Sequence, residues 1–260
     1  MRKIVTITLI SLLGFPVLSQ KEKSDCDTTN INLRNKRVII VDNCDTIINI
    51  RKKKSEAHWA GIDFGFTTLM NSSFDNSFSD HPYWKNDPAK STVWNLNLLE
   101  HKFQIAKHYF GVTTGLGFSF TSIGFKDNYV VNHTPDTLNA FIDTLTNYRK
   151  NKLSATYLTV PLLFEFNTNA NSSKSFYLAA GVVGGVRIAS ALKRKGEITG
   201  EKFVQKTKGA QGLNAFKLDA LVRFGYSHWG VFASYSLLPL FDTDKTIAVY
   251  PLSFGLSINI

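Results

Sequence analysis

Large apolar side chains occupy every second position in eight separate stretches of this chain. In the last ten residues, PLSFGLSINI, the apolar residues run from Leu252 to Ile260, and small or polar residues stand between them. Successive side chains of a β-strand point to opposite faces, so the pattern predicts a strand with one apolar face and one small, polar face. A shift of phase at Leu98 and Leu99 predicts a β-bulge there. The seven other stretches are residues 57–69, 93–99, 109–120, 157–166, 175–190, 216–226 and 229–237.

The connections between these stretches alternate between long and short. The long connections are residues 71–90, 125–151 and 191–213, and the short turns are residues 106–108, 167–174 and 227–228. Outer-membrane barrels carry long loops on one rim and short turns on the other, and each strand needs about 9–11 residues to cross the bilayer. The chain is therefore predicted to be all-β, an eight-stranded antiparallel transmembrane β-barrel.

The small, polar face decides between a membrane barrel and a soluble one. A soluble lipocalin-like barrel also has alternating strands, but its apolar face points inward and its other face meets water. Exposed strand faces of soluble proteins favour Lys, Glu and Thr, whereas this face is mostly Gly, Ser, Asn and Thr. Small residues suit the crowded axis of an eight-stranded barrel, and bulky residues suit lipid. We therefore expect the apolar face to point outward into lipid.

Aromatic residues near the strand ends agree with a membrane barrel. Trp and Tyr are enriched where such a barrel meets the two membrane interfaces. We expect Trp59, Tyr109 and Trp229 at the periplasmic interface and Trp94, Tyr157 and Tyr250 at the outer one.

The start of the chain, MRKIVTITLISLLGFPVLSQ, is typical of a secretory signal peptide. Two cations precede an apolar run, and small residues lead to an expected cleavage site after Ser19. No later stretch has the ~18 uninterrupted apolar residues that a membrane-spanning helix needs. With the segment after the signal peptide in the periplasm, the long connections face the exterior. The predicted organisation is a signal peptide at 1–19, a periplasmic N-terminal segment and linker at 20–55 with β-like runs at 38–41 and 46–50, and an outer-membrane barrel at 56–260.

Two cysteines, Cys26 and Cys44, lie in the N-terminal segment. An even pair in an oxidising compartment predicts one small-loop disulfide, and two free thiols are the alternative. The sequence has no second cysteine pair or neighbouring histidine to supply metal ligands, so we expect no metal site.

The predicted inward face carries a few charged residues. An eight-stranded barrel is just wide enough for its own side chains to fill the lumen. We therefore expect these charges to neutralise one another as a structural plug, with a narrow or gated pore as the alternative. The predicted network consists of Asp63, Glu165, Arg187, Lys217, Asp219 and Arg223.

Enzymatic activity is not expected. A barrel hydrolase needs a His paired with Ser or Asp at the outer rim, where a base can reach its nucleophile. The sole candidate dyad is His81 with its neighbour Asp80. Side chains adjacent in sequence diverge, so we predict no enzyme and no cofactor.

The connection at 191–213 is strongly basic. Its cations would meet the phosphates of lipopolysaccharide at the outer leaflet, and a merely solvated loop is the alternative. The net charge of +10 also suggests nucleic-acid binding, but the export signal and the lack of an aromatic and basic reading surface argue against it. The candidate lipopolysaccharide-facing residues are Lys193, Arg194, Lys195, Lys202, Lys206 and Lys208.

The last residues resemble the signal that the outer-membrane assembly machinery recognises. That signal has a polar residue, a Gly, and hydrophobic residues at the third-last and last positions. The corresponding residues are Ser253, Gly255, Ile258 and Ile260. The usual terminal residue is aromatic, and Ile260 departs from that pattern.

Several stretches resemble the PorT-like outer-membrane β-barrel proteins of the Bacteroidota. They are HWAGIDFGF, GVTTGLGF, TYLTVPLLFEF, AAGVVGGVRI and YPLSFGLSINI, and the resemblance spans residues 56–260. It implies an outer-membrane barrel domain. One branch of the family is implicated in type IX secretion, which implies a structural or accessory role in an envelope or secretion assembly. A small-solute channel is the alternative function.

Overall fold

In the computed structural model of this protein, the chain divides into two compact units, Met1–Lys54 and Ser55–Ile260. The predicted signal peptide, Cys26 and Cys44 lie outside the described residues, and so does the candidate disulfide. Helices in the described part of the chain are short 3-10 turns, and none is long and apolar enough to span a membrane. The described residues are 28–33, 36–41, 47–51 and 57–260, without 80, 107–108, 127, 135, 170–173 and 199.

The described part of the N-terminal unit is a three-stranded antiparallel sheet. Strand β1 (Thr28–Leu33) pairs with β2 (Lys36–Val41), and β2 pairs with β3 (Ile47–Arg51). The β-like runs at 38–41 and 46–50 correspond to β2 and β3. Strand β1 was not predicted, because its sequence, TTNINL, has only two large apolar residues.

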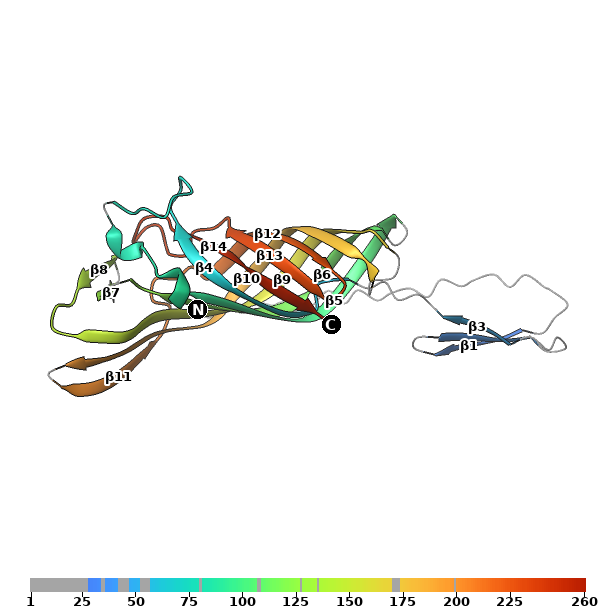
Figure 1. Ribbon diagram of the computed structural model, residues 1–260, viewed down its shortest axis with the longest axis horizontal. Coiled ribbons are helices and arrows are strands. Elements are labelled where there is room, and N and C mark those ends of the chain that lie inside the picture. The colour runs from blue at the N-terminus through green and yellow to red at the C-terminus, as the bar shows by residue number, and fades with distance from the viewer. Residues whose placement is uncertain are drawn as a thin grey trace, which may run out of the picture. The chain divides into compact units, whose positions relative to one another are not determined.

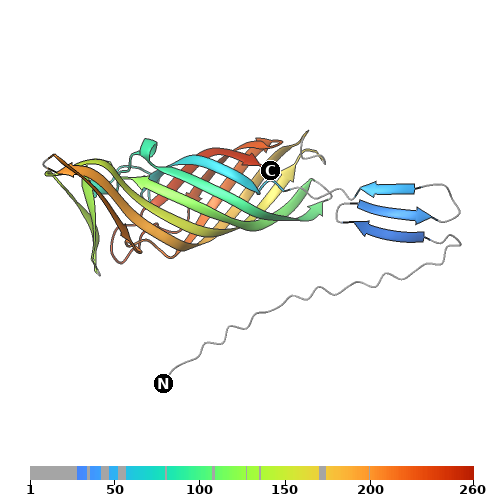
Figure 2. The same cartoon turned by 90° about the horizontal axis from the view of Figure 1, so that it is seen from below.

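Eight antiparallel strands of the second unit close into a ring (Figures 1 and 2). Each strand pairs with the next one along the chain, and β14 pairs with β4 to close the ring. Each alternating stretch forms one of these strands, which confirms the predicted eight-stranded barrel. The strands are β4 (Gly61–Met70), β5 (Thr92–Ala106), β6 (Phe110–Gly124), β9 (Asn147–Asn167), β10 (Phe176–Ile198), β12 (Phe216–Tyr226), β13 (Trp229–Ser236) and β14 (Tyr250–Asn259).

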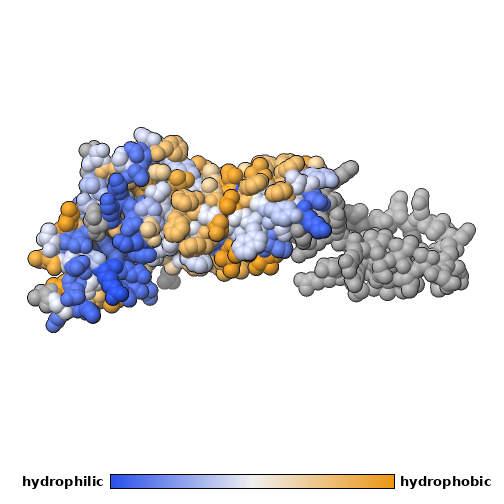
Figure 3. All heavy atoms as spheres, in the orientation of Figure 1, coloured by the Kyte–Doolittle hydropathy of each residue, from blue (hydrophilic) through white to orange (hydrophobic). Residues whose placement is uncertain are grey.

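The apolar face of the strands points outward. In β14, Phe254 and Leu256 expose 51% and 59% of their surface, whereas Ser253 and Ser257 expose 6% and 0%. Figure 3 shows hydrophobic residues gathered over the middle of the barrel and hydrophilic residues at the end that carries the long connections. A water-soluble chain would bury these large side chains, so their exposure fits a surface covered by lipid.

A β-bulge at Leu98 in β5 changes which side chains face the lumen. The pairing with β6 shifts register between Asn97 and Leu99, where the sequence predicted a bulge. Before the bulge, odd-numbered residues such as Asn97 are buried, and after it the even-numbered Lys102 is buried. The extra residue therefore turns Lys102 into the barrel.

A second bulge, at Ile188 in β10, also exchanges the inward and outward faces, here for the part of the strand near the long connections. The pairing with β9 shifts register between Arg187 and Ala189. Val186 and Ile188 are exposed on the outward face before the shift. Beyond it, the odd-numbered Lys193 lies on the outward face, directly opposite Lys152 of β9.

The long connections contain regular structure of their own. Residues 71–91 include two 3-10 turns, η1 (Pro82–Trp84) and η2 (Pro88–Lys90), and the next long connection includes the hairpin of β7 (Tyr129–His133) and β8 (Leu138–Ile142). The stretch 191–213 was predicted as a loop, but residues 191–198 extend β10, and this extension pairs with β11 (Glu201–Lys208). This prediction was wrong because the stretch is charged and has no continuous apolar face. Its turn contains Gly200 at φ +88°, a conformation that favours glycine.

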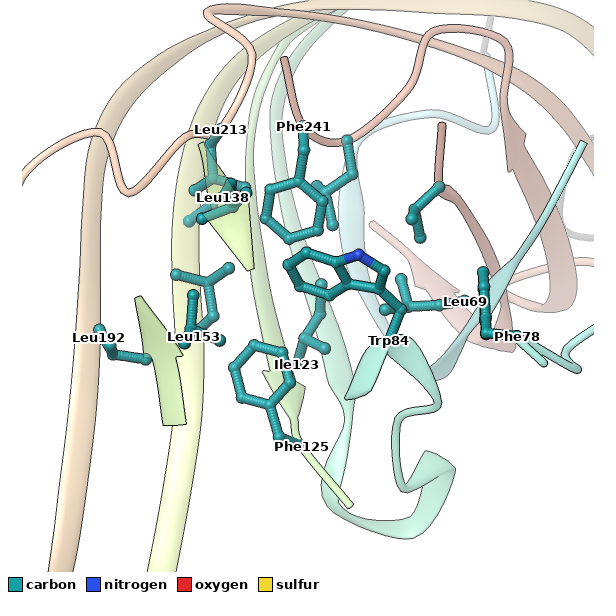
Figure 4. Close-up of a cluster of buried hydrophobic side chains, with 14 of the residues drawn as sticks. Leu69, Phe78, Trp84, Ile123, Phe125, Leu138, Leu153, Leu192, Leu213 and Phe241 are labelled. Atoms are coloured by element: carbon teal, nitrogen blue, oxygen red, sulfur yellow. The ribbon is translucent and has the colours of Figure 1, made fainter. Parts of the chain in front are cut away.

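Buried hydrophobic side chains from the long connections and the adjoining strand ends pack together at one end of the barrel (Figure 4). Trp84 is fully buried, and its ring centroid lies 4.3 Å from that of Phe241. Its indole Nε1 donates to Thr246 Oγ1 at 3.1 Å. We call this group the cap cluster. It consists of Leu69, Phe78, Trp84, Ile123, Phe125, Val131, Leu138, Leu153, Ala155, Tyr157, Leu192, Leu213, Leu240, Phe241 and Val249.

Two of the predicted interfacial aromatic residues face the barrel interior instead. Trp59 and Tyr157 each expose only 3% of their surface. For Tyr157 the reason is its position in β9, since the outward side chains of that strand are the even-numbered ones. Trp94, Tyr109 and Trp229 are exposed on the outside of the barrel.

Candidate functional site

Glu165 lies in the lumen near the short-turn end, at the centre of a buried polar cluster. Its Oε1 lies 2.9 Å from Lys102 Nζ and 2.9 Å from His58 Nδ1. Its Oε2 accepts from the His58 backbone N–H at 3.2 Å and from Thr113 Oγ1 at 2.7 Å. A carboxylate only accepts hydrogen bonds, so His58 Nδ1 carries the proton. We call these four residues the Glu165 cluster.

The Glu165 cluster joins four neighbouring elements of the barrel. His58 precedes β4, Lys102 lies on β5, Thr113 on β6 and Glu165 on β9. Tyr177 of β10 stacks on the His58 ring with centroids 4.1 Å apart. The cluster therefore ties together strands that are up to about a hundred residues apart in the chain.

The absence of a side chain at Gly230 makes room for the Tyr177 hydroxyl. The Tyr177 hydroxyl accepts from Asn259 Nδ2 at 2.8 Å. A Cβ atom at Gly230 would lie 2.1 Å from that hydroxyl, so only glycine fits there.

The Glu165 cluster is the first layer of buried charge in the lumen, and the second layer is an ion pair between Arg223 and Asp63. Both side chains are 1% exposed, and the Arg223 guanidinium donates directly to Asp63 Oδ2. The same oxygen accepts from Asn95 at 3.1 Å and from Asn97 at 3.0 Å. Buried ions need this kind of hydrogen-bond satisfaction to offset their loss of water.

Arg223 also links the second layer to the first. Its Nη1 donates to the backbone carbonyls of His58 and Trp59 at 3.2 and 3.3 Å. The guanidinium carbon lies 4.7 Å from the centroid of the Trp59 ring, within the range of a cation–π contact. This contact explains why Trp59 lies inside the barrel rather than at the membrane interface.

The third layer lies toward the long connections. Lys217 Nζ lies 2.9 Å from Asp219 Oδ2, and Ser236 Oγ donates to Asp219 Oδ1 at 2.6 Å. Lys217 also lies 5.5 Å from the centroid of the Tyr157 ring, and Tyr157 belongs to the cap cluster. Two cavities border this layer, with volumes of about 20 and 30 Å³. Each has room for about one or two water molecules.

Five of the six predicted lumen charges join these layers, and Arg187 does not. Its Nη1 donates to the backbone carbonyls of Ala210 at 3.1 Å and Leu213 at 2.5 Å. The connection after β11 folds back onto β10, so carbonyl groups rather than carboxylates surround Arg187. It therefore anchors that connection instead of neutralising a buried charge.

The basic connection separates into two faces. Arg194 faces inward and donates to the Val131 carbonyl at 2.7 Å. Lys193, Lys206 and Lys208 line one groove, together with lysines of β9. Lys195 and Lys202 line a neighbouring cavity of about 460 Å³ that also contains Glu197.

The residues of the resembled assembly signal also divide between the two faces. Ser253 is buried, and its Oγ lies 2.8 Å from Thr67 Oγ1. Gly255 pairs with Gly65, and a Cβ on Gly255 would lie 2.1 Å from the Phe64 carbonyl oxygen. Ile258 and Ile260 are exposed on the outward face.

His81 has a partner other than the one considered from the sequence. Its Nδ1 lies 2.7 Å from the Tyr83 hydroxyl. Asp80 lies outside the described residues.

The sequence of this chain matches the outer membrane protein beta-barrel domain family over residues 58–245. The chain belongs to this family. The match includes every element of the filled lumen up to the end of β13, and β14 lies beyond it.

Solved structures of one outer-membrane protein are similar to this β-barrel domain protein. They are structures of Ail, the attachment invasion locus protein of Yersinia pestis. One is 14% identical with a TM-score of 0.30, and the similarity covers 77% of this chain and 99% of that one. The other, in complex with the heparin analogue sucrose octasulfate, is 13% identical with a TM-score of 0.31 and coverages of 77% and 95%. Among curated proteins, none matches the sequence.

Three residues of the Glu165 cluster of this outer-membrane barrel were missed from the sequence: His58, Lys102 and Thr113. A signal for Lys102 was present, because a bulge at Leu98 moves the following even-numbered residues to the inward face. His58 lies at the start of the alternating stretch 57–69 but precedes the first barrel strand, β4, so the alternation did not place its side chain. Thr113 belongs to the small, polar face, and nothing in the sequence distinguishes it from the other residues of that face.

Proposed function

We propose that this protein is a closed, non-enzymatic barrel that serves as a structural or accessory component of an envelope or secretion assembly of the type IX kind. The observation that carries the proposal is the filled lumen, in which three layers of paired charges are followed by the cap cluster. A barrel with such an interior acts through its surfaces rather than through a channel. The resemblance to PorT-like proteins of the Bacteroidota supports the choice of assembly.

The proposal includes an orientation. The signal peptide is removed after Ser19, the N-terminal segment lies in the periplasm, and the long connections face the exterior. The C-terminal residues from Ser253 to Ile260 serve as the signal for the outer-membrane assembly machinery. Barrels of this class usually carry their long loops on the outside, which supports the orientation.

A structural role for the buried histidine supports the absence of catalysis. The His58 and Glu165 side chains are 3% and 1% exposed, and Lys102 and Thr113 occupy the remaining positions around the carboxylate. A catalytic pair must reach a substrate. This pair is enclosed, so its hydrogen bonds hold strands together.

Planar-bilayer recording separates the closed barrel from the alternative, a small-solute channel. The inserted protein is expected to give no steady current, since paired side chains and small cavities occupy the lumen. A porin of known conductance inserted under the same conditions is the control. A steady current whose ion selectivity changes in Arg223→Gln would establish the channel and overturn the closed barrel.

Deleting residues 20–54 tests whether the N-terminal segment contacts the assembly. The barrel is expected to fold without them, because the second unit makes its own closed ring. Affinity capture from cross-linked cells is expected to recover the partner proteins with the full chain and to lose them with the deletion. Unchanged recovery would assign the partner contact to the barrel, and no recovery with either chain would refute the assembly role.

A further inference from the structure

The outward face of the extended β9, β10 and β11 strands carries a groove of about 680 Å³. Lysines and small or hydroxyl side chains line it, and no carboxylate of the described residues does. We call it the lysine groove. Its lysines are Lys150, Lys152, Lys193, Lys206 and Lys208.

Three of these lysines stand side by side on neighbouring strands. Lys152 is paired with Lys193, and Lys193 is paired with Lys206. Directly opposite residues on one sheet face have Cβ atoms about 5 Å apart, and like charges there are destabilising. Within the described residues, none of the three forms a salt bridge. An anion with several charges would balance such a row.

A lysine in the neighbouring connection shows the contrasting arrangement. Lys90 Nζ lies 3.1 Å from Asp87 Oδ2. The hydrogen bond from Lys90 holds the pKa of the Asp87 carboxyl below its ordinary value. Lys90 thus has a carboxylate in a salt bridge, whereas none of the described carboxylates forms one with the row in the groove.

The groove begins where the lipid-facing surface of β9 ends. The outward residues between 158 and 166 are all apolar, and this length matches the ~9–11 residues of strand that cross a bilayer. The next outward residues of the same strand are Thr156 and Ser154, which line the groove, followed by Lys152 and Lys150. The lysines therefore lie just beyond the apolar belt, on the same side of the strand.

We propose that the lysine groove binds the phosphate groups of a lipid in the outer leaflet, which in a bacterial outer membrane is lipopolysaccharide. Cationic side chains next to a membrane surface are attracted to anionic headgroups, and long lysine side chains can reach back toward the phosphates. The groove adjoins the surface that lipid chains cover, which favours a lipid over a polyanion from solution. This inference deepens the proposed function and rests on its orientation of the long connections.

The test measures retention of lipid A by the purified, detergent-solubilised protein in native mass spectrometry. The probes are lipid A with two phosphates and the same lipid after enzymatic dephosphorylation. The full chain is expected to retain the phosphorylated lipid. The triple variant Lys152→Gln, Lys193→Gln, Lys206→Gln is expected to bind it about a hundredfold more weakly, since each cation contributes to attraction at a charged surface. Heat-modifiable gel mobility shows that each variant is folded.

A matched variant removes the same charge elsewhere. Lys85→Gln, Lys126→Gln, Lys174→Gln changes three exposed lysines outside the groove and is expected to leave retention unchanged. Equal loss in both triple variants, or equal retention of the dephosphorylated lipid, would overturn the proposal. Displacement of the lipid by inorganic phosphate or a sulfated polysaccharide would instead identify a soluble anion site. If the variant with all three groove substitutions does not fold, the three single variants are each expected to bind lipid A about fivefold more weakly.

The orientation is tested separately from the groove. Protease treatment of intact cells is expected to cleave within residues 191–213. Absence of cleavage there, with lipid A still retained by the purified protein, would refute the orientation and leave the groove as a binding site for phosphorylated lipid of the other leaflet.

Discussion

Glu165→Gln is expected to lower the free energy of unfolding by about 3–5 kcal/mol. The substitution keeps the size of the side chain but removes the charge that neutralises Lys102, whose ammonium lies 2.9 Å away and is 2% exposed. The ammonium would then be a buried, unpaired ion, which is the costly result of removing one partner of a buried pair. Denaturant unfolding of the barrel in detergent or lipid, followed by heat-modifiable gel mobility, measures the change.

Two further variants make this prediction specific to the buried pair. Lys102→Met in the Glu165→Gln background is expected to recover most of the lost stability, because it removes the unpaired charge and leaves an apolar side chain of similar length. Asp242→Asn, which breaks a partly exposed pair with Lys245 at 3.9 Å, is expected to cost less than about 1 kcal/mol. Equal costs for Glu165→Gln and Asp242→Asn would show that the Glu165 cluster does not hold the barrel together.

Trp84→Ala is expected to loosen the cap cluster by about 3–5 kcal/mol, the usual cost of truncating a fully buried large aromatic side chain. Trp84 is completely buried, packs on Phe241 and donates to Thr246. When opening is fast relative to cleavage, proteolysis follows the population of the open form. Cleavage of the connection at 71–91 is therefore expected to accelerate about a hundredfold or more, while the ring of strands keeps its heat-modifiable mobility.

The control for the cap cluster lies in the same connection. Phe74 is 68% exposed, so Phe74→Ala removes an aromatic ring without opening a buried cavity. Its cleavage rate is expected to stay within a few-fold of that of the full chain. If Trp84→Ala is cleaved no faster than Phe74→Ala, the long connections are not held on the barrel by Trp84.

The alternation of apolar and small residues was sufficient to predict the barrel, because strand faces are encoded locally. Residues such as Phe254 and Leu256 reveal their common face through a spacing of two, whatever strand lies beside them. The same reasoning placed Asp63, Glu165 and Arg223 on the inward face, where the structure has them buried.

Which of these charges pair with one another could not be predicted from the pattern within single strands. Glu165 meets Lys102, which lies 63 residues earlier in the chain, because the bulge at Leu98 turns Lys102 inward. It meets His58 because the chain before β4 enters the lumen. Periodicity describes one strand at a time and contains no register between strands. Which acid faces which base is therefore a property of the closed ring.

By itself, the sequence determined the number of strands in the barrel, their antiparallel order and the face that meets lipid, since each follows from a two-residue period and from connection lengths. The tertiary structure decided the three charge layers, the cap cluster and the row of Lys152, Lys193 and Lys206. Each of these depends on which strands and connections meet in the closed ring, and the bulges at Leu98 and Ile188 place Lys102 and the lysine row. A shift of one residue exchanges the two faces of a strand, so side chains beyond a bulge are placed by pairing rather than by pattern.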